Sequence, residues 1–355
     1  MLFSNPYLRT TLKPEEPEKR GRALGLIGMV FGLAFIIGPI LGGVILPFGW
    51  RWLFWMNVPL ALLVGAGAMA LLPGRVPGRR SGFDLAGMAV LALLLASFAW
   101  GVNHIDTARF FASLVSPQAG LAILAAIALA FPLAAIERRS RSPVAPFALL
   151  GSRRLVAASI VNIGAGMAEA SLVYVAQLAM AAFGVSPARG SILMLPLVAA
   201  MTVGAPLSGR ALDRAGPRPV IAAGALVMAG GMLSLGLSGT SFFLFIAGQV
   251  LVGLGLSAML GAPIRYLFLE ESRPEDRSAA QGLVNLESST GMLMGGAAIG
   301  AVTASSGGGA AGFHAAYLVL AGISVLLFLV TPFLGKTVGK GAPGPAAGAP
   351  AGMQE

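Results

Sequence analysis

Two carboxyl groups stand at positions where acidic side chains are rare. Of the fourteen acidic residues in the chain, Glu169 and Glu287 are the two that fall well inside long apolar stretches. A charged side chain at the centre of a bilayer costs at least ~2.5–3.5 kcal/mol, so residues of this kind are candidates for function. A carboxyl group shielded from water stays uncharged until water or a cation reaches it. Each of these two residues could therefore take up and release a proton or bind a cation.

Two amide side chains accompany Glu169. At about 100° per residue of helix, Asn162, Glu169 and Gln177 fall within an arc of about 80° and form one polar stripe. The amides could hydrogen-bond the carboxyl group, and we expect Glu169 to carry a coupling proton or to meet a cationic ligand. Alternatively, a protonated Glu169 bonds a neighbouring helix for structure alone. The sequence leaves both interpretations open.

Glu287 shares a helix face with two glycines. Gly291 and Gly295 follow it at a spacing of four residues, which is typical of closely packed membrane helices, while Asn285 and Ser288 lie on another face. Glu287 is a second candidate for proton coupling. The alternative is a structural hydrogen bond to a facing helix or to a backbone carbonyl group.

The elements that must position these side chains are apolar stretches of membrane-spanning length. A bilayer core about 30 Å thick needs roughly 20 mostly apolar residues per helix. Only 11% of the chain is charged and 56% is hydrophobic, whereas soluble domains are roughly 25% charged. The apolar runs do not alternate as in a β-barrel. We therefore predict an all-α integral membrane protein with ten spans, near 22–46, 53–73, 84–104, 118–136, 155–183, 190–208, 218–238, 242–264, 278–302 and 313–335.

The basic residues orient these spans. Of the 24 Lys and Arg residues, all but Arg51, Arg109 and Arg189 fall in the termini and in alternate connections. The positive-inside rule then places both termini in the cytoplasm. The net charge of +10 is scattered over short loops, which argues against nucleic-acid binding. The abundance of Arg, Ala and Gly is associated with a bacterial source, so we expect a bacterial inner membrane.

Several classes of chemistry are excluded. The chain has no cysteine, which rules out disulfides, thiolate nucleophiles and cysteine metal sites. It has no Gly-x-Ser-x-Gly motif, no cluster of histidines with acids, and no phosphate-binding loop. We therefore expect neither an enzyme nor an ATP-driven pump, and neither a metal nor a cofactor.

Two glycine-rich motifs carry a resemblance to a known family. The first span contains Gly32, Gly38, Pro39, Gly42 and Gly43, and a tryptophan-rich segment follows at 50–60. Together they resemble the fifth helix, with its antiporter motif, and the start of the sixth helix in the major facilitator superfamily. The 14-helix drug:proton antiporter branch of that family is the most similar.

A second motif lies after the sixth span. Its spacing, Gly-x-x-x-Asp-Arg-x-Gly-x-Arg, is similar to the cytoplasmic loop motif of the same family. Asp213 could accept hydrogen bonds from the start of the following helix and pair with Arg214 or Arg218. The motif consists of Gly209, Asp213, Arg214, Gly216 and Arg218.

The resemblance implies the domain organisation. It covers helices five to fourteen of the family, so that four N-terminal helices are missing and the C-terminal six-helix half is intact. We favour the interpretation that the sequence is a fragment. The expected divisions are a cytoplasmic segment 1–21, a two-helix remnant of the N-terminal bundle 22–73, two linker helices 84–136, a cytoplasmic connection 137–154, the six-helix bundle 155–335 and a disordered tail 336–355.

The resemblance also implies a function. It makes the chain a secondary transporter that exports small lipophilic or drug-like molecules by alternating access, with the proton as the coupling ion. In such a protein Asn162, Glu169, Gln177 and Gln249 would line the substrate cavity. The alternative is a membrane fragment that keeps the fold and transports nothing, and an upstream reading frame encoding four more spans would argue against it.

Overall fold

The computed structural model describes residues 37–38, 41–42, 44–45, 48–49, 51–71, 84–105, 112–113, 115–139, 151–273 and 276–335. Within these ranges the regular structure is helical, with no strand. The all-α prediction is therefore confirmed. The first predicted span, at 22–46, and the tail 336–355 lie largely or wholly outside the described residues.

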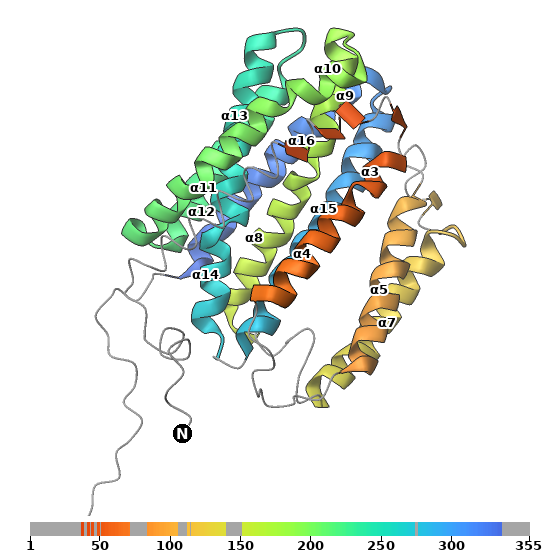
Figure 1. The fold of residues 1–355 in the computed structure, drawn as a ribbon, viewed down its shortest axis with the longest axis vertical. Helices are drawn as coiled ribbons and strands as arrows, with labels where there is room; N and C mark the ends of the chain where they lie inside the picture. The colour runs from red at the N-terminus through yellow and green to blue at the C-terminus, as the bar shows by residue number, and fades with distance from the viewer. Residues whose placement is uncertain are drawn as a thin grey trace, which may run out of the picture.

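The C-terminal part of the chain forms one bundle (Figure 1). Within it α12 packs against α13 and α16, and α8 packs against α15. Its core contains large buried side chains such as Ile221, Met228, Phe245 and Leu256. The helices are α8 (Arg153–Glu169), α9 (Ser171–Phe183), α10 (Pro187–Leu193), α11 (Leu195–Ala215), α12 (Pro217–Gly236), α13 (Phe242–Leu260), α14 (Ala262–Glu271), α15 (Arg277–Ser305) and α16 (Gly309–Val330), followed by the 3-10 turn η5 (Thr331–Leu334).

Three predicted spans are interrupted, which the sequence analysis did not foresee. The 155–183 span breaks at Ala170, the 190–208 span at Met194 and the 242–264 span at Gly261. Prolines lie in the first turn of both α11 and α14, and a proline cannot donate the hydrogen bond that would continue the preceding helix. At the first break the Tyr317 hydroxyl donates to the Ser171 carbonyl oxygen at 3.0 Å.

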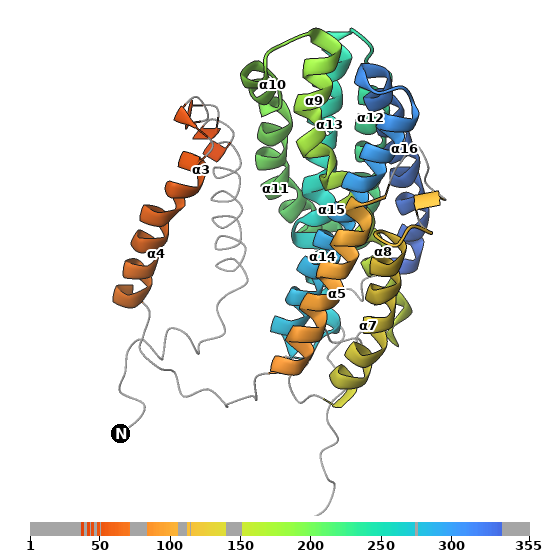
Figure 2. The same cartoon turned by 90° about the vertical axis from the view of Figure 1, so that its right-hand side faces the viewer.

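The N-terminal helices lie outside this bundle. α3 (Arg51–Trp55) and α4 (Asn57–Leu71) pack against each other, and none of Arg51–Ala70 is buried. Figure 2 shows α4 standing apart from α8 to α16. α5 (Leu85–Asn103) and α7 (Gly120–Arg139) form a second pair, which contacts the bundle through α15. Most apolar side chains of these helices therefore remain on the surface, although Ala126 and Leu133 of α7 are buried.

Eight helical segments among the described residues are long and apolar enough to cross a membrane. They correspond to eight of the ten predicted spans. α15, which corresponds to the predicted 278–302 span, is 29 residues long but is not among the eight. It carries several polar side chains, Glu287 among them, and packs them partly against α8 rather than toward lipid.

Candidate functional site

Helices α8 and α15 approach each other closely because glycines line their contact. A Cβ atom added at Gly291 would overlap the carbonyl oxygen of Ile163, and one at Gly295 or Gly166 would overlap the facing backbone. Small residues permit such an approach between membrane helices. The face predicted from the spacing of Glu287, Gly291 and Gly295 is thus a packing face, and it turns Glu287 toward α8.

Glu287 meets Asn162 across this contact. Nδ2 of Asn162 donates to Oε2 of Glu287 at 3.0 Å and to the carbonyl oxygen of Val284 at 2.8 Å. The Ser288 hydroxyl donates to Oδ1 of Asn162 at 3.1 Å. Asn162 is 0% exposed and Glu287 is 7% exposed. A buried carboxyl group therefore depends on a side chain from another helix for its hydrogen bond.

The pair lies at the same depth on both helices. α8 begins at Arg153, about nine residues before Asn162, and α15 begins at Arg277, about ten residues before Glu287. At about 1.5 Å per residue, both side chains are roughly 15 Å from those helix starts. This distance is about half the thickness of the apolar core of a bilayer, which is about 30 Å.

The predicted polar stripe is divided by the structure. Asn162 faces α15, whereas Gln177 is exposed on α9 and Glu169 is the last residue of α8. Among the residues that the structure describes, Glu169 has no hydrogen-bond partner, and its side chain is only partly buried. Glu169 and Glu287 thus differ in kind, because one is unpaired and accessible and the other is paired and buried.

Gln249 lies in α13 and is fully buried. Neither its Oε1 nor its Nε2 atom has a hydrogen-bond partner within the described ranges. A buried polar group left without a partner costs about 1–3 kcal/mol. The side chain is therefore able to gain a hydrogen bond from a polar group that reaches it.

A guanidinium group on α14 is held by two amides, a contact that the sequence analysis missed. Arg265 donates to Oε1 of Gln281 at 3.0 Å and to Oδ1 of Asn285 at 2.9 Å, both on α15. The sequence offered one signal, the four-residue spacing of Gln281 and Asn285 on one helix face.

A second arginine joins three elements at one end of the bundle. Arg154 of α8 forms ion pairs with Glu270 at 2.9 Å and Glu271 at 3.2 Å, both at the end of α14. Its Nε atom also donates to the carbonyl oxygen of Leu334 at 2.8 Å. α8 therefore begins at the end of the bundle where α14 and η5 finish.

Of the predicted loop motif, only Gly216 forms the connection between α11 and α12. Gly209, Asp213 and Arg214 lie in the last turns of α11, and Arg218 lies in the first turn of α12. Gly216 has a φ of 80°, which favours glycine, and the next residue starts α12. Asp213 is exposed, and the described residues show no hydrogen bond or ion pair from it to Arg214 or Arg218. The expected capping of α12 by Asp213 is absent in this structure.

The first glycine motif is described only in part. Gly32, Pro39 and Gly43 lie outside the described residues. A Cβ atom added at Gly38 or Gly42 would meet nothing within 4 Å in the described structure. Their predicted role in close helix packing stays a prediction.

Two pockets lie at opposite ends of the bundle, and neither contains the buried carboxyl pair. One of about 460 Å³ lies between the start of α12 and the end of α16, and one of about 340 Å³ lies between α9, α10 and the start of α13. In the described part of the chain no three His, Asp or Glu side chains come together as a metal site would require.

Comparison with known proteins gives the family. The sequence profile described as Major Facilitator Superfamily matches residues 15–152 and 158–355. Among individual proteins, the chain is 28% identical to the multidrug transporter protein MdtP of Bacillus subtilis over 264 residues, which is 72% of this chain and 47% of that protein. It is 30% identical to the tetracenomycin C resistance and export protein of Streptomyces glaucescens over 308 residues, 81% of this chain and 54% of that protein.

An uncharacterised transporter of the same type, YfiU of Bacillus subtilis, is 28% identical over 284 residues, covering 78% of this chain and 54% of that protein. The chain therefore spans about half the length of the curated relatives it matches. The similarity extends over most of the chain, from the N-terminal helix pairs to the C-terminal bundle.

Proposed function

Because the chain belongs to the Major Facilitator Superfamily, we propose that it takes part in secondary active transport, exporting small lipophilic or drug-like molecules in exchange for protons. The relatives named as multidrug and tetracenomycin C exporters support this substrate class. The observation that carries the proposal is the buried carboxyl group of Glu287, hydrogen-bonded to Asn162 on another helix.

Glu287 is the proposed proton site. Its hydrogen bond joins α8 to α15, so the charge of the carboxyl group and the relative position of the two helices depend on each other. Deprotonation would leave a charge near the middle of the bilayer, which is costly unless water or a cation reaches it. The proton-dependent step is then a small displacement of α8 against α15 that admits water to Glu287.

Glu169 has a different proposed role. It is partly exposed and lacks a partner in the described structure, so it can meet a cationic substrate directly. Asn162, Gln177 and Gln249 are the proposed polar contacts of the substrate cavity, and the unpaired amide of Gln249 offers a donor and an acceptor. A mostly apolar cavity with a few polar groups suits a lipophilic molecule.

The domain organisation supports alternating access. We propose that α8 to α16, with η5, form one of the two bundles that rock about a midplane site, and that α5 and α7 are linker helices beside it. α3 and α4 belong to the other bundle. The arginine-rich ends face the cytoplasm, and the membrane is the inner membrane of a bacterium.

The alternative is a membrane protein that folds but does not transport. The specific observation in its favour is the isolation of α3 and α4, which bury no residue of Arg51–Ala70 against the rest of the described chain. A carrier of this type needs both walls of its cavity.

The experiment measures uptake of tetraphenylphosphonium into inside-out vesicles that contain the full chain, with and without an imposed pH gradient. We expect gradient-dependent uptake that Glu287→Gln reduces at least tenfold, while Glu169→Gln raises the KM for the cation. Ser305→Ala, on α15 but at its far end, is the matched control. Absence of uptake by a folded chain would establish the alternative, and unchanged gradient dependence in Glu287→Gln would refute the proton site.

A further inference from the structure

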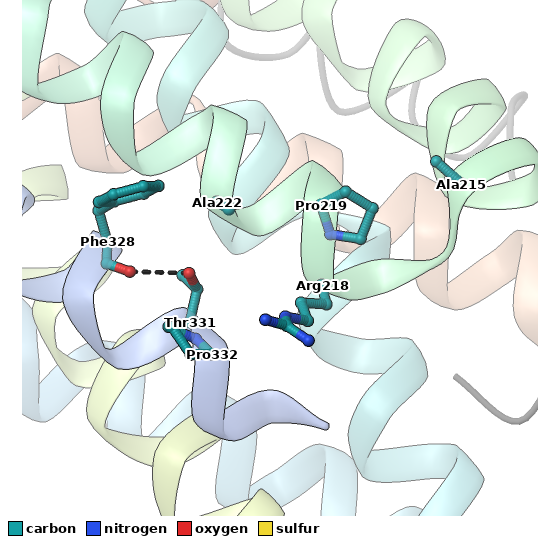
Figure 3. Close-up of a pocket in the computed structure, with 7 residues that line it drawn as sticks. All are labelled: Ala215, Arg218, Pro219, Ala222, Phe328, Thr331 and Pro332. Carbon is teal, nitrogen blue, oxygen red and sulfur yellow. Dashed lines mark hydrogen bonds between the residues drawn. The ribbon is translucent and has the colours of Figure 1, made fainter. Parts of the chain in front are cut away.

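The larger pocket is lined by one cationic side chain, that of Arg218, and by mostly apolar side chains. It has a volume of about 460 Å³ and is lined by Ala215, Arg218, Pro219, Ala222, Phe328, Thr331 and Pro332. Figure 3 shows the Arg218 side chain reaching toward Thr331 and Pro332 from α12, with Phe328 on the facing helix. The Thr331 hydroxyl donates to the Phe328 carbonyl oxygen at 2.7 Å. Arg218 therefore supplies the hydrogen-bond donors of this pocket.

No acidic side chain neutralises Arg218 within the described structure. The nearest carboxylate in sequence, Asp213, is exposed and forms no ion pair with it. Arg210 and Arg214 on the preceding helix are exposed as well. The start of α12, which carries a partial positive charge, adds to this positive region. The pocket thus favours an anion.

Apolar surface continues from the pocket along both helices. On α12, Ala222 and the 48% exposed Leu226 follow Arg218 at successive four-residue steps, which places them on one face. On α16, Val325 is 45% exposed and Leu329 58% exposed. The surface is therefore cationic at the pocket and apolar toward the middle of the helices.

The pocket lies at the ends of two helices of membrane-spanning length. α12 begins there and α16 ends there, and both helices are long and apolar enough to cross a membrane. A guanidinium at the end of such a helix suits a phosphate, to which it can donate two parallel hydrogen bonds. Basic pockets between membrane helices are suited to anionic lipid headgroups.

We propose that this pocket binds an anionic glycerophospholipid. Its phosphate accepts hydrogen bonds from Arg218, and one acyl chain lies along Ala222, Leu226 and Val325 between α12 and α16. The lipid joins the two helices at the end of the bundle where the Arg154 ion pairs also lie. This site is independent of the proposed transport activity, since it shares no residue with the Glu287 region.

The test counts lipids that remain bound to the purified full chain in native mass spectra. The protein in mild detergent receives an equal mixture of dioleoyl phosphatidylglycerol and dioleoyl phosphatidylcholine. We expect one retained phosphatidylglycerol, and a preference over phosphatidylcholine that Arg218→Gln reduces about fivefold, the effect of one basic residue near a lipid surface. Arg218→Lys keeps the charge and should keep most of the preference.

Arg210→Gln is the matched control, because Arg210 is exposed nearby but does not line the pocket. It should retain the lipid. Ala222→Phe fills the apolar wall and should weaken retention without a change of charge. The proposal is overturned if Arg218→Gln retains phosphatidylglycerol like the unaltered protein, or if the unaltered protein retains both lipids equally. Displacement of the lipid by glycerol 3-phosphate would also overturn it, because that result would indicate a site for a free anion.

Discussion

At the scale of single residues, the carboxyl group of Glu287 differs from that of Glu169 in its partners. Glu287 is 7% exposed and accepts a hydrogen bond from Asn162 at 3.0 Å. Asn162 in turn accepts one from Ser288. The amide therefore connects a carboxyl group, a hydroxyl group and a backbone carbonyl. Its removal would take away the hydrogen bond to Glu287, whereas the Ser288 hydroxyl would still donate to the Val284 carbonyl oxygen at 3.1 Å.

We predict that Asn162→Ala destabilises the bundle through this loss. Hydrogen bonds between membrane helices are worth about 0.6 kcal/mol on average and up to about 1.7 kcal/mol. A double-mutant cycle of Asn162→Ala and Glu287→Met, in which neither variant can form the hydrogen bond, followed by thermal unfolding in detergent, should give a coupling energy in that range. Ser305→Ala combined with Glu287→Met serves as the control pair. A coupling of zero for the first pair would show that the hydrogen bond contributes nothing.

The polar pairs show what the sequence could predict at this scale. The sequence singled out Glu169 and Glu287, and the amides Asn162 and Gln177, because a polar residue inside an apolar run stands out in the sequence alone. It assigned Asn162 to Glu169, seven residues away on the same chain segment, whereas the structure gives it to Glu287, which is 125 residues away. Partners on different helices depend on how the helices pack, and no helical wheel contains that information.

At the scale of elements, the glycines of α15 fix the distance between α15 and α8. Their spacing predicted a packing face, and the structure confirms close approach at Gly291 and Gly295. The breaks at Ala170, Met194 and Gly261 were not predicted. A hydropathy average over a whole span is insensitive to one turn of irregular backbone. Pro196 and Pro263 did indicate two of the breaks, because proline favours the first turn of a helix.

We predict opposite effects for two glycine substitutions on α15. Gly291→Ala places a methyl group against the Ile163 carbonyl oxygen and should lower stability by about 1–3 kcal/mol. Gly300→Ala is the matched control, since its Cβ atom would meet nothing within 4 Å in the described structure. Alanine favours the helix by about 1 kcal/mol, so this variant should be neutral or more stable. Equal unfolding temperatures for the two variants would contradict the close packing.

The Arg154 contacts predict a local effect at the end of α16. Arg154→Gln removes the ion pairs with Glu270 and Glu271 and the donor to the Leu334 carbonyl oxygen. Global stability should fall by about 1 kcal/mol, because ion pairs that water still reaches contribute little and these side chains are only partly buried. Amide hydrogen exchange of η5 should become faster, while Arg153→Gln, an exposed neighbour, should leave it unchanged. Unaltered exchange in Arg154→Gln would show that the contact does not hold η5.

At the scale of the whole molecule, the amino-acid composition and the distribution of charge were enough to predict the class of protein. The low charged fraction and the long apolar runs predicted a multi-pass helical membrane protein, and the family profile and the eight membrane-length helices confirm it. The two motifs predicted the family. The sequence could not predict that no residue of Arg51–Ala70 is buried among the described helices, because helix packing depends on contacts between segments that are distant in sequence.

The absence of cysteine makes the proposed orientation easy to test. Thr240 and Ala215 are exposed residues that flank α12 at its two ends. We predict that Thr240→Cys reacts with a membrane-impermeant maleimide on intact cells, whereas Ala215→Cys reacts only after the membrane is opened. The reverse pattern would invert the topology, and equal reaction of both would show that α12 does not cross the membrane.

Proton coupling at Glu287 can be measured directly by counting the protons released when tetraphenylphosphonium binds to the purified full chain, with a pH-sensitive dye in weak buffer. If Glu287 is the proton site, about one proton should leave per bound cation, because in the proposed exchange the cation bound near Glu169 disfavours the proton on Glu287. Glu287→Gln should still bind the cation and release none, while Ser305→Ala should behave like the unaltered protein. Release of the same number of protons by Glu287→Gln would contradict the account.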